Sequence, residues 1–161
     1  MTIAVYPGSF DPFTKGHMDI VERGAGIFDE IVVGVLMNSS KQPFFELDER
    51  VTLIQEACKG IKNVRVEKFS GLLVNYMDQI GASIILKGLR AVADYEYELS
   101  MAQMNKCLNS KVETMFLMSN SNFSHVSSSM IKDIVRLGGD VSEFLPENIN
   151  KILINRINGR I

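Results

Sequence analysis

The sequence has few of the residues that mark a secreted or a membrane protein. It contains two cysteines, Cys58 and Cys107, in 161 residues, too few for the disulfide framework of a secreted domain. Both fall in helix-like segments, so we expect buried free thiols. The longest apolar run, Ile31–Met37, is far shorter than the ~20 residues of a membrane span, and the N-terminus lacks a signal-peptide pattern. We therefore expect a cytoplasmic protein without a membrane partner.

Basic charge and the common phosphate-binding motifs are also missing. The formal net charge of −2 argues against a nucleic-acid partner held by general basicity. The sequence has no Gly-x-x-x-x-Gly-Lys-Ser/Thr loop and no Gly-x-Gly-x-x-Gly after its first apolar run, which argues against P-loop and dinucleotide-fingerprint chemistry. Histidines and cysteines nowhere have metal-ligand spacing, so the sequence identifies no metal ligands.

What the chain does contain is a regular alternation of strand-like and helix-like segments. Strands are expected at Thr2–Tyr6, Glu30–Met37, Asn63–Phe69, Ala82–Lys87 and Val112–Met118. Helices are expected at His17–Phe28, Leu47–Lys59, Leu72–Gln79, Ala91–Leu108, Ser127–Leu137 and Pro146–Ile157. This alternation predicts a single α/β domain over residues 1–161, a Rossmann-like, doubly wound, five-stranded parallel sheet with helices on both faces. Ligands of such sheets bind beyond the carboxyl ends of the strands, where the strand order reverses.

One expected helix, Ala91–Leu108, carries more apolar surface than one buried face requires. Its first apolar stripe consists of Val92, Tyr95, Leu99 and Ala102, and an offset second stripe consists of Met101, Met104 and Leu108. Two interpretations remain open. The helix is either deeply buried, or it lies between its own sheet and a neighbouring subunit.

The segment YPGSFDPFTKGH, Tyr6–His17, follows the first expected strand. Its two prolines and its glycines indicate a sharp, stiff turn, and TKGH brings His17 to the first turn of a helix. Backbone N–H groups and the positive end of the helix dipole make that position an anion site. His17 and Ser9 can each add a hydrogen bond to a phosphoryl oxygen. The alternative is a helix capped by Thr14, with His17 in solvent.

Three further loops bring phosphate-binding groups to the same edge. Lys87 and Arg90 surround a glycine after the fourth strand, where they could clamp phosphate oxygens or pair with nearby carboxylates. Ser127–Ser129 follow the fifth strand at the start of a helix and offer hydroxyl and N–H groups to a polyphosphate. Lys41 follows the second strand. His125, taken alone, is typical of an exposed loop histidine. The convergence of these loops predicts a phosphate site.

Four segments together closely resemble the pantetheine-phosphate adenylyltransferase family. They are YPGSFDPFTKGH, KGLRAVADYEYE, VSSSMIKDIVR and FLPEN. TKGH matches the [T/H]-x-G-H signature of the wider nucleotidyltransferase superfamily, and GLRAVADYEYE is more specific. The resemblance implies transfer of the AMP part of ATP to 4′-phosphopantetheine, giving dephospho-coenzyme A and pyrophosphate, with Mg²⁺ as cofactor and a homohexameric assembly. Coenzyme A differs from the product by one phosphate, so we expect it to act as a feedback inhibitor.

The resemblance also assigns roles by position. It implies that His17, Lys41 and Arg90 are catalytic, with His17 stabilising the transition state at the α-phosphate. The implied substrate-binding residues are Ser9, Lys41, Leu73 and Lys87. The implied ATP-binding residues are Ser9, Phe10, His17, Gly88, Leu89, Arg90, Glu98, Phe123, Ser124, His125, Val126, Ser127, Ser128 and Ser129. Some family members have threonine in place of Ser9 and arginine in place of Lys87, and the second difference replaces a bidentate fork by a point charge.

The implied reaction agrees with the residues that the motifs supply. The nucleophile is a phosphate oxygen that is already ionised at neutral pH, so the reaction needs no general base, and the sequence shows no Ser-His-Asp or paired-carboxylate motif. Catalysis then depends on holding two anions in line and neutralising charge at the α-phosphate. Two alternatives remain: a nucleotidyltransferase acting on nicotinamide mononucleotide or a polyol phosphate, and a nucleotide-binding protein without turnover.

Overall fold

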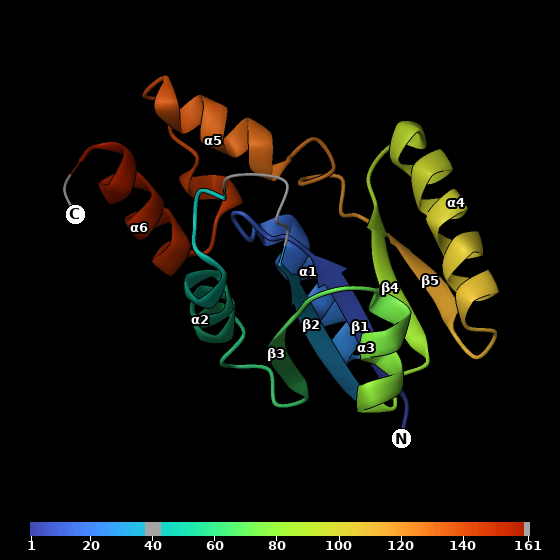
Figure 1. Ribbon diagram of the computed structural model, residues 1–161. Coiled ribbons are helices and arrows are strands. Elements are labelled where there is room, and N and C mark those ends of the chain that lie inside the picture. Colours follow the sequence, from blue (N-terminus) through green and yellow to red (C-terminus); the bar gives the residue numbers. More distant parts are fainter. Residues whose placement is uncertain (38–42, 160–161) are drawn as a thin grey trace.

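A parallel five-stranded sheet forms the centre of the computed structural model, which describes residues 1–37 and 43–159 (Figure 1). The strands are β1 (Ile3–Gly8), β2 (Glu30–Leu36), β3 (Val64–Phe69), β4 (Ile84–Leu89) and β5 (Glu113–Met118). Their order in the sheet is β3-β2-β1-β4-β5, so the order reverses between β1 and β4. The doubly wound α/β fold expected from the alternation is therefore confirmed.

Helices cover both faces of this sheet. They are α1 (Lys15–Ala25), α2 (Leu47–Ala57), α3 (Leu73–Ile80), α4 (Val92–Leu108), α5 (Ser128–Arg136) and α6 (Glu147–Ile157), with a 3₁₀ turn at Ser142–Phe144. Successive residues of a strand point to opposite faces. Ala4 and Tyr6 of β1 accordingly join the larger core, with α1, α2, α5 and α6. Ile3 and Val5 join a second core, with α3.

The strands β1 and β4 each extend two residues beyond the expected ends at Tyr6 and Lys87. Pairing with the neighbouring parallel strands extends β1 and β4 beyond the residues that favour strands by their own propensity. Gly8 lies opposite Val35 of β2, and Leu89 lies opposite Met118 of β5. Residues that the sequence places in turns, such as Pro7 and Gly88, therefore belong to the rigid sheet.

Helix α4 is not deeply buried, so that interpretation of its two apolar stripes is wrong for this chain. Tyr95, Leu99, Met101, Met104 and Leu108 are each between 37% and 56% exposed. Figure 1 shows α4 lying along the outer side of β4 and β5, away from α2 and α6. The interpretation that remains is a helix with one face available to a neighbouring subunit.

The same position of α4 corrects one expectation about the cysteines. Cys58 is a buried free thiol, 4% exposed, and burial raises its pKa to about 11. Cys107 is also free but exposed, because it lies on a helix that has little packed against it. Among residues 1–37 and 43–159, none of the helices combines the length and the apolar character that a membrane span requires.

Candidate active site

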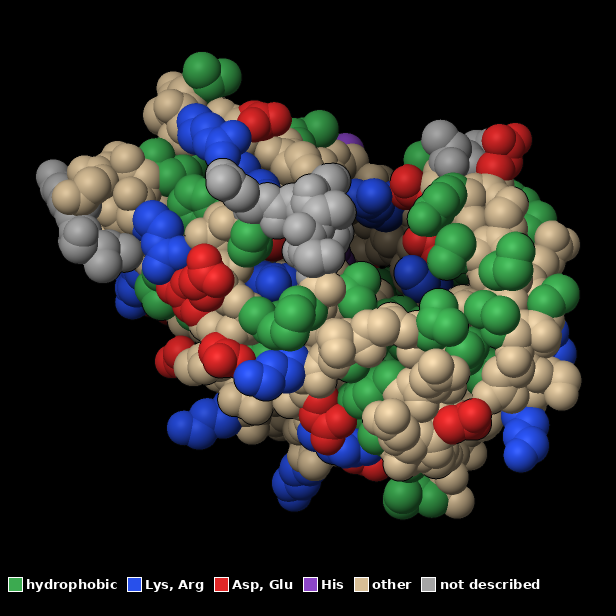
Figure 2. Space-filling view, viewed as in Figure 1, with side chains coloured by type: hydrophobic (Ala, Val, Ile, Leu, Met, Phe, Trp, Pro, Cys, Tyr) green, Lys and Arg blue, Asp and Glu red, His purple; other side chains and the backbone are tan. Residues whose placement is uncertain are grey.

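The sheet opens at the carboxyl ends of β1 and β4. In the described part of the chain these strands pair only at Ala4–Ile84 and Val5–Ile85, whereas β1 pairs with β2, and β4 with β5, along their whole lengths. Beyond Val5 and Ile85 lies a cavity of about 340 Å³. Figure 2 shows the molecule hollowed here, with basic and acidic side chains at the opening. The cavity lies at the switch point of strand order, where such folds bind ligands.

Most of the residues expected to bind ATP line this cavity. They are Ser9, Phe10, His17, Gly88, Arg90, Glu98, Phe123, Val126, Ser127, Ser128 and Ser129, together with Lys87. Leu89, Ser124 and His125 are outside its lining, and His125 is exposed and packs against the ring of Phe144. Lys41 lies outside the described residues. The individual roles of these residues stay predictions.

The loop after β1 fixes the orientation of the His17 ring. Thr14 is the N-cap of α1 and accepts a hydrogen bond from the His17 backbone N–H at 3.3 Å, while the Thr14 N–H donates to His17 Nδ1 at 3.0 Å. Because Nδ1 accepts from a backbone N–H, the ring proton of the neutral imidazole must be on Nε2. Thr14 is thus a cap, as one interpretation expected, and its contacts with the ring make Nε2–H the donor of His17.

His17 packs among three rings and is partly buried, so it is not the solvated side chain of the second half of that interpretation. The ring centroids of Phe10, Phe13 and Tyr6 lie 5.2, 5.5 and 6.4 Å from that of His17. Desolvation by this packing, and secondarily the positive charge of Arg90, lower the His17 pKa from 6.5 to about 4. His17 is therefore neutral at physiological pH and can act as a hydrogen-bond donor.

Close packing shapes the floor of the cavity at two glycines. Phe10 has a positive φ of 48°, a left-handed conformation that is unfavourable for a bulky residue. It holds its ring against Gly8, where an added Cβ would lie 2.7 Å from the ring. A Cβ at Gly88 of β4 would lie 3.0 Å from Ile20 of α1. Strand and helix backbones therefore approach as closely as side chains allow.

Lys87 of β4 and Arg90, which follows this strand, are engaged within the chain. Lys87 Nζ lies 3.2 Å from Glu98 Oε2. Arg90 pairs with Asp94 at 3.1 Å and donates through Nη1 to the Val126 carbonyl at 2.9 Å. Both are thus paired with carboxylates, as the alternative interpretation expected, and both still line the cavity. Arg90 connects the loop after β4 to the loop after β5.

The three serines at the start of α5 differ in their contacts. Ser127 is the N-cap, and its hydroxyl accepts from the Met130 N–H at 3.2 Å. The Ser128 hydroxyl donates to the Pro12 carbonyl at 2.8 Å. Two of the three hydroxyls that the sequence offered to a polyphosphate are therefore used for folding. The N–H groups of Ser128 and Ser129, which a helix leaves without intrahelical partners, remain the candidate anion donors of this segment.

A second, more apolar cavity of about 320 Å³ adjoins the first. Leu73 lies here, with Phe69, Leu72, Tyr97 and Met101. The two cavities share Pro7 and Gly8 of β1 and the ion pair formed by Lys87 and Glu98. In Figure 2 hydrophobic side chains gather beside the hollow. The site is thus a polar chamber and an apolar chamber separated by an ion pair.

Sequence reasoning missed several residues of the polar cavity, namely Tyr6, Pro7, Gly8, Thr14, Gly16, Ile20 and Ser119. Tyr6 is buried, and burial raises the pKa of its hydroxyl, so the hydroxyl stays protonated. Its position at the carboxyl end of a strand next to the switch point was the available signal. Ser119 directly follows β5 and could have been identified in the same way.

Comparison with known proteins agrees with this geometry. The family model described as cytidylyltransferase-like matches residues 5–134. Proteins named phosphopantetheine adenylyltransferase are 50% identical in Clostridium novyi, over 98% of both chains, and 53% identical in Staphylococcus haemolyticus, over 94% of both. One from Heliobacterium modesticaldum is 56% identical over 91% of this chain and 87% of its own.

Two solved structures share the fold at low sequence identity. A putative nicotinate-nucleotide adenylyltransferase from Vibrio parahaemolyticus superposes with a TM-score of 0.74 at 17% identity, covering 99% of this chain and 96% of its own. A bifunctional NMN adenylyltransferase/ADP ribose pyrophosphatase from Francisella tularensis, complexed with AMP and an Mn ion, gives 0.70 at 13% identity, over 98% of this chain and 49% of its own. By its sequence, its matched domain and its fold, the chain belongs to the phosphopantetheine adenylyltransferase family of cytidylyltransferase-like nucleotidyltransferases.

Proposed function

We propose that the protein transfers the adenylyl group of ATP to 4′-phosphopantetheine, releasing pyrophosphate and forming dephospho-coenzyme A. The observation that carries this proposal is the pair of adjoining cavities that share Lys87. The polar cavity suits a nucleoside triphosphate, and the apolar cavity suits an extended pantetheine arm. A cation between them is placed to hold the phosphate of the acceptor. The names of the relatives support the same reaction.

The chemistry is an in-line displacement at the α-phosphorus. An ionised phosphate oxygen of the acceptor forms a bond to the α-phosphorus, while the bond from that phosphorus to the bridging oxygen of the β-phosphate breaks. The electron pair leaves with pyrophosphate, and no proton has to be removed from the nucleophile. The work of the protein is therefore alignment and charge stabilisation.

Each part of the polar cavity has a role in this proposal. His17 donates from Nε2 to an α-phosphate oxygen as charge builds there. Arg90 and the N-terminal N–H groups of α5 hold the nucleotide phosphates. Ser9 and Lys87 hold the acceptor phosphate, and Leu73 contacts the pantetheine arm. Lys41 is the third proposed catalytic residue.

We propose Mg²⁺ as the cofactor, brought to the site on the ATP phosphates. Among the described residues, His, Cys, Asp and Glu form no group of three that could hold a metal ion, and Glu98 is the one carboxylate in the lining of the polar cavity. Mg²⁺ characteristically keeps several waters and uses substrate phosphates with one or two carboxylates, so this donor set fits it. When bound, it neutralises phosphate charge.

The proposal extends to assembly and regulation. The exposed apolar face of α4 supports an assembly in which a neighbouring chain covers this helix, and we propose that this assembly is a homohexamer. Coenzyme A shares the pantetheine arm and the nucleotide of the product, so it should compete for both cavities. Competition of coenzyme A with 4′-phosphopantetheine in steady-state kinetics tests the second point, and absence of inhibition at every acceptor concentration would reject it.

The main test measures pyrophosphate release from ATP and Mg²⁺ with three acceptors. These are 4′-phosphopantetheine, unphosphorylated pantetheine and nicotinamide mononucleotide. Release with phosphopantetheine alone is the expected result. Release only with nicotinamide mononucleotide would retain the chemistry but change the acceptor. ATP binding without release in any reaction would identify a binding protein.

A further inference from the structure

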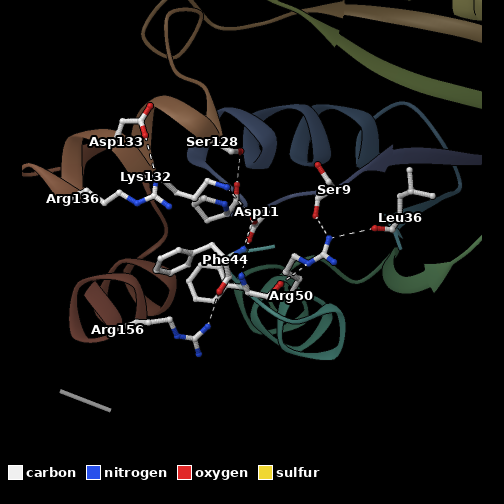
Figure 3. A network of polar contacts seen from close by, with 12 residues as sticks. Ser9, Asp11, Leu36, Phe44, Arg50, Ser128, Lys132, Asp133, Arg136 and Arg156 are labelled. Carbon is white, nitrogen blue, oxygen red and sulfur yellow. Dashed lines mark hydrogen bonds and ion pairs between the residues drawn. The ribbon is translucent and has the colours of Figure 1, made fainter. Parts of the chain in front are cut away.

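Asp11 is a buried carboxylate that lies behind the polar cavity and does not line it. Its Oδ2 and Oδ1 atoms accept hydrogen bonds from the backbone N–H groups of Phe44 and Phe45, each at 2.8 Å. Its Oδ2 also receives the ammonium of Lys132, from α5, at 2.9 Å. Figure 3 shows these contacts converging on Asp11 from separate segments of the chain.

Helix α5 contacts the same short segment through a second residue. The Ser128 hydroxyl donates to the Pro12 carbonyl at 2.8 Å. Ser128 and Lys132 are four residues apart, so they lie one turn apart on one face of the helix. Two successive turns of α5 therefore contact residues 11 and 12, and both partners of the ion pair are mostly buried, with side chains 11% and 19% exposed.

A second buried group, Arg50 of α2, also contacts the loop after β1 and the segment before α2. It is 4% exposed, and its guanidinium donates to the backbone carbonyls of Ser9 at 2.5 Å, Phe45 at 3.1 Å and Leu36 at 3.4 Å. Figure 3 shows Arg50 reaching toward Ser9 and Leu36. Asp11 and Arg50 together connect the loop after β1 with the end of β2 and the start of α2.

We propose that Asp11 and Lys132 are positioning residues for adenylyl transfer, because their ion pair sets the N-terminus of α5 against the loop that carries Ser9 and leads into His17 of α1. The proposal rests on the proposed function. Neither side chain lines the polar cavity, yet each is bonded to a segment that does. The ion pair thus acts through the loop after β1 and the start of α5.

Stability alone does not explain this arrangement. A mostly buried ion pair costs desolvation that can equal or exceed its Coulombic gain, so it is weak evidence for a stabilising role. The ion pair should matter more for the rate of the reaction than for the stability of the fold. Displacing a reacting group by about 1 Å can lower the rate on the order of 10²-fold. The pair joins residues that are 121 positions apart, and Lys132 lies within about one turn of the serines that line the polar cavity.

The test replaces Lys132 by methionine, which keeps the length and the apolar stem but removes the charge. We expect kcat for pyrophosphate release to fall by about 10- to 100-fold, with the KM for ATP changed less than about threefold because the phosphate-binding groups are all retained. Lys132→Arg retains the cation and should restore most of kcat. A matched control is Arg65→Met, which breaks the ion pairs with Glu30 and Glu67 on β2 and β3, away from both cavities.

Amide hydrogen exchange gives a readout that does not depend on turnover. Lys132→Met should speed exchange in residues 9–13 and 127–131 while the rest of the sheet stays protected, and Arg65→Met should not. An unchanged kcat in Lys132→Met, an equal loss in Arg65→Met, or a uniform rise in exchange would each overturn the proposal. If the unaltered protein shows no turnover, the proposed function fails, and the exchange data alone decide whether the ion pair holds the two segments together.

Discussion

The two walls of the polar cavity are built in different ways. The wall formed by the loop after β1 and by α5 is fixed by buried contacts, including Asp11 to Lys132 and Arg50 to three carbonyls. The opposite wall, formed by the loop after β4 and by α4, is held by partly exposed pairs, Lys87 with Glu98 and Arg90 with Asp94. We call the first the closed wall, because contacts within the chain tie it together, and the second the open wall, because α4 presents a row of apolar side chains to its surroundings.

This difference suggests that the two walls serve different steps of the proposed reaction. The closed wall contains Thr14, which fixes the tautomer of His17 at the start of α1, and small displacements here should affect the proposed transition state. The open wall carries Lys87, which we propose holds the acceptor phosphate, and it lies on the side of the molecule where α4 exposes apolar side chains. Changes in the closed wall should therefore affect kcat, and changes in the open wall should affect acceptor binding and assembly.

The largest effect is expected from His17→Ala in the closed wall. Loss of one transition-state donor should lower kcat by on the order of 10²–10³-fold, with ATP affinity largely retained in calorimetry. His17→Gln, which retains an N–H donor, should recover part of the rate. Loss of ATP affinity with an unchanged kcat would show that His17 serves binding and would remove the contrast between the walls.

A smaller effect is expected from Lys87→Met in the open wall. A hydrogen bond to a charged group contributes about 1.5–3 kcal/mol, so KM for phosphopantetheine should rise by about 10- to 100-fold while KM for ATP changes little. Steady-state kinetics with each substrate varied in turn would measure this. Lys87→Arg, the residue of some relatives, is the control and should keep acceptor binding. A rise confined to KM for ATP would place Lys87 in the nucleotide site.

The next prediction affects assembly more than turnover. Leu108→Glu places a charge on the exposed apolar face of α4, where Leu108 is 52% exposed. If another copy of the chain covers this face, the mass measured by light scattering should fall toward the 18.0 kDa of one chain. Leu137→Glu, at a residue that is 89% exposed beyond α5, is the matched control and should leave the mass unchanged. The same mass for both variants would contradict an interface on α4.

The smallest effect is expected from pH. Because the His17 pKa is lowered to about 4, its ionisation should not change kcat/KM of the free enzyme between about pH 6 and 8. In the unfolded chain His17 takes up its proton near pH 6.5, so the unfolded state binds more protons between about pH 6.5 and 4. The free energy of unfolding should therefore decrease as pH falls through this window. A step near pH 6.5 in kcat/KM that His17→Gln removes would contradict a neutral His17.

Much of the fold could be predicted because each strand and helix has its own pattern of apolar residues in the sequence. The apolar run at Ile31–Met37 and the TKGH segment each lie within a few residues of the observed β2 and α1. The positions of the phosphate-binding loops followed from the parallel sheet, since the carboxyl ends of parallel strands share one edge. The family resemblance supplied the rest of the candidate residues.

The contacts between distant segments could not be predicted in this way. Asp11 and Lys132 are 121 positions apart, and nothing in either local sequence identifies the other as its partner. The use of the Ser128 hydroxyl by Pro12, and the exposure of Cys107 on α4, likewise depend on how elements pack. Helical periodicity shows that α4 is apolar on two sides, but it does not show which side a given chain leaves uncovered.

The short pairing between β1 and β4 limits how this site can evolve. Where the described strands stop pairing, the main-chain edges around Pro7, Gly8 and Gly88 line the cavity. No substitution can delete a peptide group, and a Cβ at either glycine would meet Phe10 or Ile20. The polar cavity is therefore constrained by backbone geometry, whereas the apolar cavity, proposed for the acceptor, also depends on side chains of α3 and α4 such as Leu73 and Tyr97. A lineage that exchanges those side chains can acquire a new acceptor without rebuilding the sheet.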